Sequence, residues 1–114
     1  MGDGVMVAAN ATLNPLVELG TGVICNTSSS IDHECKIGDF THIAPGAVLC
    51  GNVLVGKGTF VGANSVVRQG IKIGNNVTIG AGTVVVKDIP DGATVVGNPA
   101  KSLIKKPARK LVAA

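Results

Sequence analysis

Histidine is the side chain best suited to proton transfer near neutral pH, and this sequence contains two, His33 and His42. His33 follows Asp32 and precedes Glu34. A carboxylate next to an imidazole can fix its tautomer and raise its basicity, which a general base for an alcohol or an amine requires. Taken alone, the Asp32-His33 dipeptide is weak evidence, because such a pair more often belongs to an ordinary polar surface, so its meaning depends on where the fold places it.

Metal chemistry finds little support in the sequence. The three cysteines, Cys25, Cys35 and Cys50, are odd in number and lack the spacing of metal ligands, and two histidines are too few for a three-histidine zinc site. We therefore expect no metal, and cysteines kept reduced in a cytoplasmic protein. The sequence has no signal peptide, and every apolar stretch is interrupted by polar residues or glycine, so we expect no membrane association.

The composition indicates one aliphatic domain. Of the 114 residues, 46% are hydrophobic but only 2% are aromatic, and 16 are glycine, which disfavours a helical fold. The segment 1–100 contains five Lys or Arg against seven Asp or Glu, whereas the segment 101–114 contains five further Lys or Arg. An acidic body without aromatic side chains for base stacking argues against nucleic-acid binding. The basic tail could instead attract a phosphorylated cofactor.

A six-residue period predicts the architecture. An aliphatic residue or cysteine recurs at every sixth position from Val7 to Val85 without an insertion, and the position four residues after each is always small or β-branched. The recurring residues are Val7, Leu13, Leu19, Cys25, Ile31, Ile37, Ile43, Leu49, Val55, Val61, Val67, Ile73, Ile79 and Val85. Such a unit cannot bury its apolar residue alone, so successive units must wrap into a coil and stack.

Three six-residue faces form a triangular prism, so three hexads complete each coil, with the turn expected at the residue that follows each large aliphatic position. We expect a lead-in at residues 1–6, an all-β solenoid at 7–90, and a turn with a basic C-terminal cap at 91–114. Cys25 and Cys35 then occupy inward positions, which favours a core role over a nucleophilic one.

Positions that differ by 18 in number stack in columns on this prism, which places Gly51 above His33. Two adjacent columns of small residues rise from Asn26 and Thr27, and they leave backbone groups within reach of an extended ligand, although small residues also fit the corners of a tight prism. His42 is half a coil from His33, so the two imidazoles face apart within one chain. They can converge only across a subunit boundary, which predicts a homotrimer with its sites at the seams. The small residues are Ala44, Gly62 and Gly80 above Asn26, and Pro45, Ala63 and Ala81 above Thr27.

The chain resembles the hexapeptide-repeat acyltransferases, and in particular the acetyltransferase domain of the sialic-acid O-acetyltransferase and bacillosamine-type nucleotide-sugar N-acetyltransferase family. The resemblance rests on Asn26-Thr27, the run from Ile31 to Ile43, Gly46-Ala47, Gly51-Asn52-Val53 and the closing run from Val96 to Lys101. It implies a left-handed parallel β-helix with a short C-terminal capping segment. It also implies an acetyl-CoA-dependent acetyltransferase whose small-molecule acceptor is a hydroxyl or an amine of a sugar or nucleotide sugar.

The same resemblance assigns roles by position. His33 matches the general base and Asp32 its orienting carboxylate. Asn26 and His42 match residues that line the acetyl-CoA site, while the backbone of Gly51, Ala63 and Ala81 matches positions beside the pantetheine arm. We place the phosphates near Lys101. Family members carry an N-terminal acceptor-binding domain that is absent here, so the alternatives are an excised domain, a natural short form, or a non-catalytic trimeric scaffold.

Overall fold

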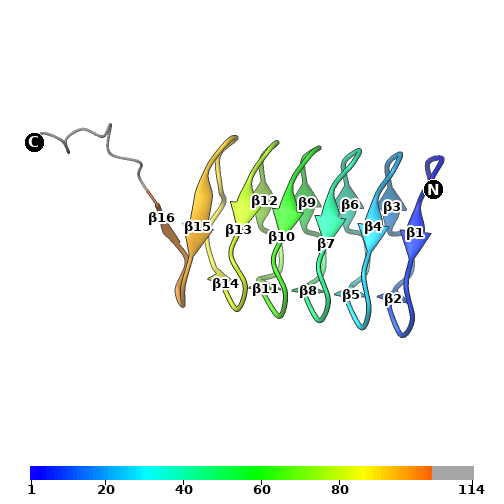
Figure 1. Cartoon of the computed structure of the whole chain (residues 1–114), viewed down its shortest axis with the longest axis horizontal. Coiled ribbons are helices and arrows are strands. Elements are labelled where there is room, and N and C mark those ends of the chain that lie inside the picture. Colours follow the sequence, from blue (N-terminus) through cyan, green and yellow to red (C-terminus); the bar gives the residue numbers. More distant parts are fainter. Residues whose placement is uncertain (104–114) are drawn as a thin grey trace, which may run out of the picture.

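The computed structural model describes residues 1–103 as a stack of short strands joined by tight turns (Figure 1). Strands of two or three residues recur along the chain, and all pairings but one are parallel. Within the described residues, no helix is long and apolar enough to cross a membrane. The predicted all-β solenoid is confirmed.

The strands form three sheets, one for each face of a triangular prism. Paired strands are separated by three hexads, as in the register of Phe60 with His42, so each coil contributes one strand to each sheet. Sheet A contains β1 (Met6–Val7), β4 (Ile24–Cys25), β7 (His42–Ile43), β10 (Phe60–Val61), β13 (Thr78–Ile79), β15 (Thr94–Val96) and β16 (Lys101–Ser102). Sheet B contains β2 (Thr12–Leu13), β5 (Ser30–Ile31), β8 (Val48–Leu49), β11 (Val66–Val67) and β14 (Val84–Val85). Sheet C contains β3 (Glu18–Leu19), β6 (Lys36–Ile37), β9 (Leu54–Val55) and β12 (Lys72–Ile73).

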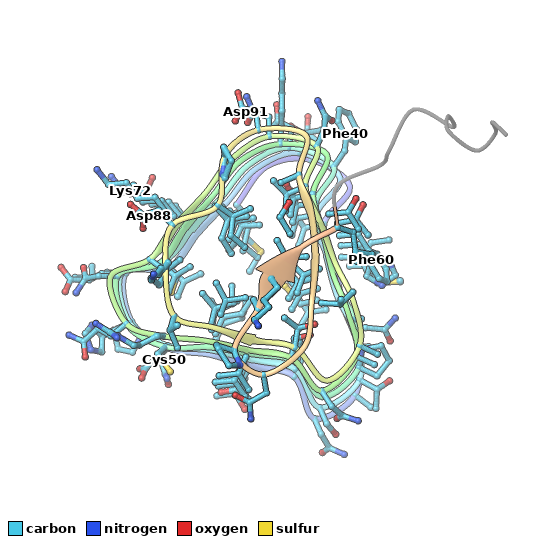
Figure 2. All side chains as sticks on the ribbon, turned by 90° about the vertical axis from the view of Figure 1, so that its left-hand side faces the viewer. Phe40, Cys50, Phe60, Lys72, Asp88 and Asp91 are labelled. Carbon is cyan, nitrogen blue, oxygen red and sulfur yellow. The ribbon has the colours of Figure 1, made fainter. Side chains whose placement is uncertain are left out.

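The coil is left-handed, as the resemblance implied. Figure 2 views the prism from its C-terminal side, with Phe60 on the right-hand face, Lys72 on the left-hand face and Asp91 at the top corner. The chain passes from Phe60 along the lower face to Lys72 and then to Asp91, so it turns clockwise while it approaches the viewer.

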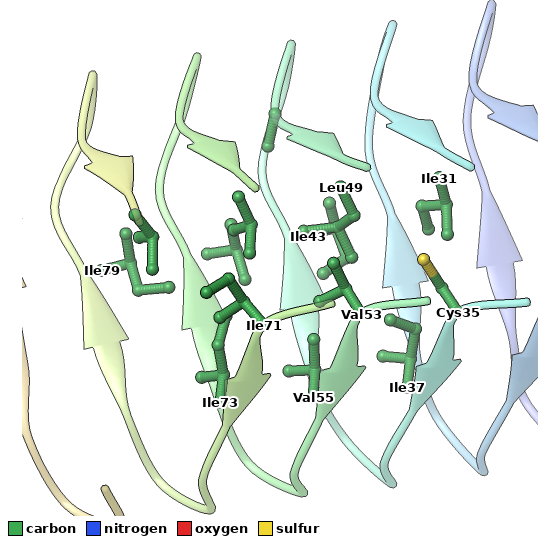
Figure 3. Packing of buried hydrophobic residues seen from close by; sticks show 14 of the residues in the cluster. Ile31, Cys35, Ile37, Ile43, Leu49, Val53, Val55, Ile71, Ile73 and Ile79 are labelled. Carbon is green, nitrogen blue, oxygen red and sulfur yellow. The ribbon is translucent and has the colours of Figure 1, made fainter. Parts of the chain in front are cut away.

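From Leu19 to Ile89 the interior is filled by the two positions of each hexad that the sequence predicted to point inward, whereas the first coil is less covered, with Val7 42% exposed. Ile31, Leu49 and Val67 are the large positions of sheet B and are fully buried. The small positions, such as Val53 and Cys35, are buried beside them, and Figure 3 shows both sets stacked in rows along the axis. Buried Thr41 and Thr59 satisfy their hydroxyls by donating to the carbonyl oxygens of Gly56 and Gly74.

The turns depend on a different position from the one that the sequence analysis selected. Every sixth residue from 4 to 82 has a positive φ, between 54° and 77°. All but four of these turn residues are Gly or Asn, which tolerate this left-handed conformation. The glycines that follow the large aliphatic positions instead allow neighbouring coils to pack closely. A Cβ on Gly38 would lie 2.6 Å from the backbone of Gly56 and Lys57 in the next coil.

The last coil is two residues shorter than the others. The spacing of three full hexads holds through Val85, but Ile89 pairs with Ile73 and Val95 pairs with Ile79, which are two positions closer in sequence. Residues 91–96, which we assigned to the turn and cap, thus add β15 to sheet A in parallel. β16 then folds back antiparallel on β15 across the end of the prism (Figure 2), while residues 104–114 of the expected cap lie outside the described residues.

Replacing a stacked core residue should destabilise the coil far more than replacing an outward one. Leu49 has no exposed surface, whereas Leu54, on the next strand, is 39% exposed. We expect Leu49→Ala to lower the free energy of unfolding by about 2–5 kcal/mol through a cavity, and the control Leu54→Ala by less than about 1 kcal/mol. Urea unfolding measures both, and equal losses would contradict this core assignment.

Candidate active site

His33 lies at the corner between sheets B and C, where its imidazole is half-exposed rather than in the core. Its Nδ1 lies 3.4 Å from Oε1 of Glu34, which is similarly half-exposed. The ring lies over Gly51 of the next coil: a Cβ there would be 2.7 Å from both Cε1 and Nε2. A carboxylate beside Nδ1 favours the tautomer that leaves Nε2 free to accept a proton.

Asp32 contacts the backbone of His33, not its ring. Oδ1 of Asp32 accepts hydrogen bonds from the backbone N–H of His33 at 2.7 Å and from Nδ2 of Asn14 at 3.0 Å. Asp32 therefore anchors the corner that carries the histidine, and Glu34 is the carboxylate nearest the ring. Glu34 adjoins His33 in the sequence, but only the side-chain geometry gives it a role beside the ring. The stacking of His33 over Gly51 was visible in the columns of the prism.

His42 and Asn26 form a second group. His42 points outward from sheet A, and its Nε2 is 3.2 Å from Nδ2 of Asn26, which follows β4. Because Oδ1 of Asn26 accepts the N–H of Thr27 at 2.7 Å, the amide nitrogen must be the donor to His42. Nε2 of His42 is thus the acceptor and Nδ1 carries the proton. The ring also meets Phe60 edge to face, with centroids 5.2 Å apart.

The two columns of small residues lie at the corner between sheets A and B, next to the Asn26–His42 pair. Ala63 and Ala81 follow β10 and β13 at this corner, and the carbonyl of Ala63 accepts the N–H of Gly82 at 2.8 Å. Ala81 is exposed and Ala63 is half-buried. Lys101 lies on β16 at the C-terminal side, paired with Val96 and exposed.

One chain therefore holds the predicted residues in two separate groups, as the half-coil offset of the histidines predicted. His33, Asp32 and Gly51 occupy the corner between sheets B and C. Asn26, His42, Ala63 and Ala81 occupy sheet A and its corner with sheet B. The five-stranded face of sheet B separates the groups.

Two of the three cysteines belong to the core. Cys25 and Cys35 are fully buried and free, as predicted from their inward positions, and burial raises the pKa of the Cys25 thiol to about 11. Burial likewise raises the pKa of Cys35, whose Sγ donates to the carbonyl of Cys50. A thiol with a raised pKa is a poor nucleophile. Within residues 1–103, no three His, Cys, Asp or Glu side chains gather into a metal-binding group.

The left-handed coil and its six-residue period define a hexapeptide-repeat protein. Residues 52–87 match the bacterial transferase hexapeptide family (six repeats). This match confirms the hexapeptide-repeat part of the resemblance, and the relatives described next confirm the acetyltransferase part.

More specific relatives are N-acetyltransferases and acetyltransferase domains. The chain is 34% identical over 113 residues to GDP-perosamine N-acetyltransferase of Escherichia coli O157:H7, covering 94% of this chain and 51% of that protein. It is 47% identical, with a TM-score of 0.89, to the acetyltransferase domain of PglB from Neisseria gonorrhoeae FA1090 in complex with acetyl coenzyme A, covering 90% of this chain and 50% of that one.

A third solved structure, PerB from Caulobacter crescentus in complex with CoA and GDP-perosamine, is 34% identical with a TM-score of 0.84. The match covers 89% of this chain and 52% of that one. The chain thus spans about half the length of the relatives it matches.

A side chain added at Gly51 should displace the candidate base. The Cβ of Gly51→Ala would lie 2.7 Å from Cε1 and Nε2 of His33, so the imidazole must move. We expect the NMR signals of the His33 ring to shift while those of His42, on another face, stay in place. Unchanged His33 signals would contradict the stacking.

Proposed function

We propose that this chain is an acetyl-CoA-dependent acetyltransferase that acetylates an amine of a nucleotide sugar, with His33 as general base. The observation that carries the proposal is the His33 ring, half-exposed beside Glu34 and over Gly51. It stands on a coil similar to a domain solved with acetyl coenzyme A. The names of two relatives, which specify GDP-perosamine, support an amine on a nucleotide sugar over a sugar hydroxyl.

The active unit of this proposal is a homotrimer with sheet B turned toward its threefold axis. The outward side chains of sheet B are small and uncharged, whereas sheet C presents Glu18, Lys36 and Lys72. Rotation about an axis in front of sheet B brings the His33 corner of one copy to the His42 corner of the next. The two groups that one chain holds apart then form one site. The outward residues of sheet B are Thr12, Ser30, Val48, Val66 and Val84.

Acetyl-CoA fits this seam as an extended donor. Asn26 and His42 line the end that holds the thioester, and the small side chains of Ala63 and Ala81 leave backbone groups open to the pantetheine arm. Gly51 keeps the space beside the base free on the facing corner. Lys101 lies further toward the C-terminal end, where its positive charge would attract the phosphates of CoA.

The reaction is a direct transfer in a ternary complex. Nε2 of His33 takes a proton from the acceptor amine as its nitrogen attacks the thioester carbonyl. A backbone N–H at the seam supports the oxyanion of the tetrahedral intermediate. When the C–S bond breaks, the sulfur of CoA leaves and receives the proton from His33. Neither buried cysteine takes part, and we place the protein in the cytoplasm, where its free thiols stay reduced.

A larger side chain at the corner between sheets A and B should block the binding of acetyl-CoA. Ala63→Leu adds a branched side chain where the pantetheine arm is placed, so acetyl-CoA binding measured by calorimetry should be lost. Sedimentation should still give a trimer for the variant and for the control Leu54→Ala, which lies on sheet C away from the seam and should bind acetyl-CoA normally. Unchanged affinity in Ala63→Leu would contradict the donor placement, and a monomeric parent protein would remove the shared site.

Replacing His33 should distinguish an acetyltransferase from a non-catalytic scaffold. With a nucleotide-sugar amine as acceptor and free CoA thiol as the readout, His33→Ala should lower turnover by about 10²- to 10⁴-fold with little change in acetyl-CoA affinity. Asp32→Asn should lower it less, since the imidazole remains. His42→Ala should instead weaken acetyl-CoA binding.

Full turnover in His33→Ala would overturn the assignment of the base. A parent protein that neither binds acetyl-CoA nor acetylates any acceptor would favour the non-catalytic scaffold.

A further inference from the structure

Some N–H groups at the corners of the prism are bound by side chains rather than by the strand ladders. At the corner between sheets C and A, two such groups lie on the second residue after a large aliphatic position. The N–H of Thr21 donates to Oδ1 of Asp39 at 2.9 Å, and the N–H of Lys57 donates to Oδ1 of Asn75 at 2.9 Å. Each acceptor stands three hexads further along the chain, so the coil that follows supplies the partner.

His33 occupies the equivalent position at the corner between sheets B and C, but the residue stacked on it has no side chain. That residue is Gly51, and a Cβ there would lie 2.7 Å from two atoms of the imidazole. A side chain at this position could not bind the N–H of His33 without displacing the ring. The N–H donates instead to Oδ1 of Asp32 at 2.7 Å. His33 is thus held from its own coil, and the space over its ring toward the C-terminal end stays open.

Asn14 supports this arrangement from the coil before. It follows β2, and its Nδ2 donates at 3.0 Å to Oδ1 of Asp32, the same oxygen that binds the N–H of His33. Its own N–H donates to the carbonyl of Ile31 at 3.0 Å, so its backbone and its side chain both contact this corner. One carboxylate oxygen can accept both bonds, and hydrogen bonds to a charged acceptor are stronger than those between neutral groups. Two consecutive hydrogen bonds therefore join Asn14 to the backbone of His33.

We propose that Asn14 is a positioning residue for the base. By donating to Asp32, it fixes the rotamer in which the carboxylate binds the N–H of His33. The base is then anchored from the N-terminal side, and the opposite side, over Gly51, is left to the thioester of acetyl-CoA. The inference rests on the proposed function and adds to it a residue that acts through Asp32 rather than on the imidazole. Such an anchor affects turnover, because displacing a catalytic group by about 1 Å can lower a rate by about 100-fold.

The most direct variant removes the donor without changing the shape of the side chain. Asn14→Asp has no N–H to donate, and it brings a second carboxylate to Asp32. We expect kcat to fall by about 5- to 30-fold and the KM for acetyl-CoA to stay within about twofold. Asn14→Ala removes the donor without adding a charge and should lower kcat by at least about threefold. A loss in Asn14→Asp alone would reflect charge repulsion and overturn the proposal.

Exchanging the two side chains tests the contact itself. When Asn14→Asp is combined with Asp32→Asn, an amide again meets a carboxylate, and the amide oxygen still accepts the N–H of His33. The double variant should turn over at least about threefold faster than Asn14→Asp, although it carries one more substitution. A double variant slower than Asn14→Asp would mean that the two residues act independently, and would overturn the proposal.

Asn75 provides the matched control. It is also a half-buried asparagine whose side chain binds a neighbouring coil, but it lies at the corner between sheets C and A. Asn75→Ala should leave kcat within about twofold of the parent. Sedimentation should give the same assembly for every variant. A comparable loss of kcat in Asn75→Ala would assign the effect to general stability, and dissociation of Asn14→Ala would assign Asn14 to the subunit seam; either result would overturn the proposal.

Hydrogen exchange followed by NMR measures the anchor without the reaction. The N–H of His33 should exchange at least about tenfold faster in Asn14→Asp and Asn14→Ala than in the parent, and at the parental rate in Asn75→Ala. Unchanged exchange in the Asn14 variants would overturn the proposal. Faster exchange in a protein that shows no turnover would uphold the anchor and reject the proposed reaction. Turnover that depends on His33 but not on Asn14 would uphold the reaction and reject the positioning role.

Discussion

The structure depends on hydrogen bonding between coils. Each coil satisfies its strand N–H and C=O groups on the coils before and after it, as in the bond from His42 N–H to the carbonyl of Thr59 at 2.9 Å. No strand of the described chain is longer than three residues, so none would be stable alone. Stability therefore favours coils of one length and shape, and this constraint produces the strict six-residue period up to Val85; the last coil is two residues shorter and still pairs through Ile89 and Val95.

The same constraint decides how a site can be built. Side chains in one column are held about 4.8 Å apart along the axis, so a chemical group can be placed accurately by its coil and its corner. His33 over Gly51 and Asn26 beside His42 are both consequences of this stacking. However, the predicted site residues lie at two separate corners of the prism. The chemistry is divided between two corners, which is why the proposed site needs a second copy of the chain.

The sequence predicted the features that repeat and missed those that do not. The inward residues from Leu19 to Val85, the stacked columns and the separation of the histidines all follow from one period. The left-handed turn position was missed because glycines also follow many of the large aliphatic residues, although Gly or Asn at all but four of the turn positions was a signal in the sequence. The shortened last coil breaks the period after Val85, so a repeat of six residues could not predict that Ile89 pairs with Ile73. Glu34 was passed over because two carboxylates flank His33, and side-chain geometry distinguishes them.

The antiparallel strand β16 has a consequence for self-association. A parallel coil exposes unpaired strand edges at its ends, and such edges invite end-to-end growth of β-structure. At the C-terminal side, β16 occupies the edge of β15 and reverses the hydrogen-bonding direction that another coil would need. A second molecule cannot continue the solenoid through sheet A from this side. A two-residue strand thereby acts as a terminator against fibre formation.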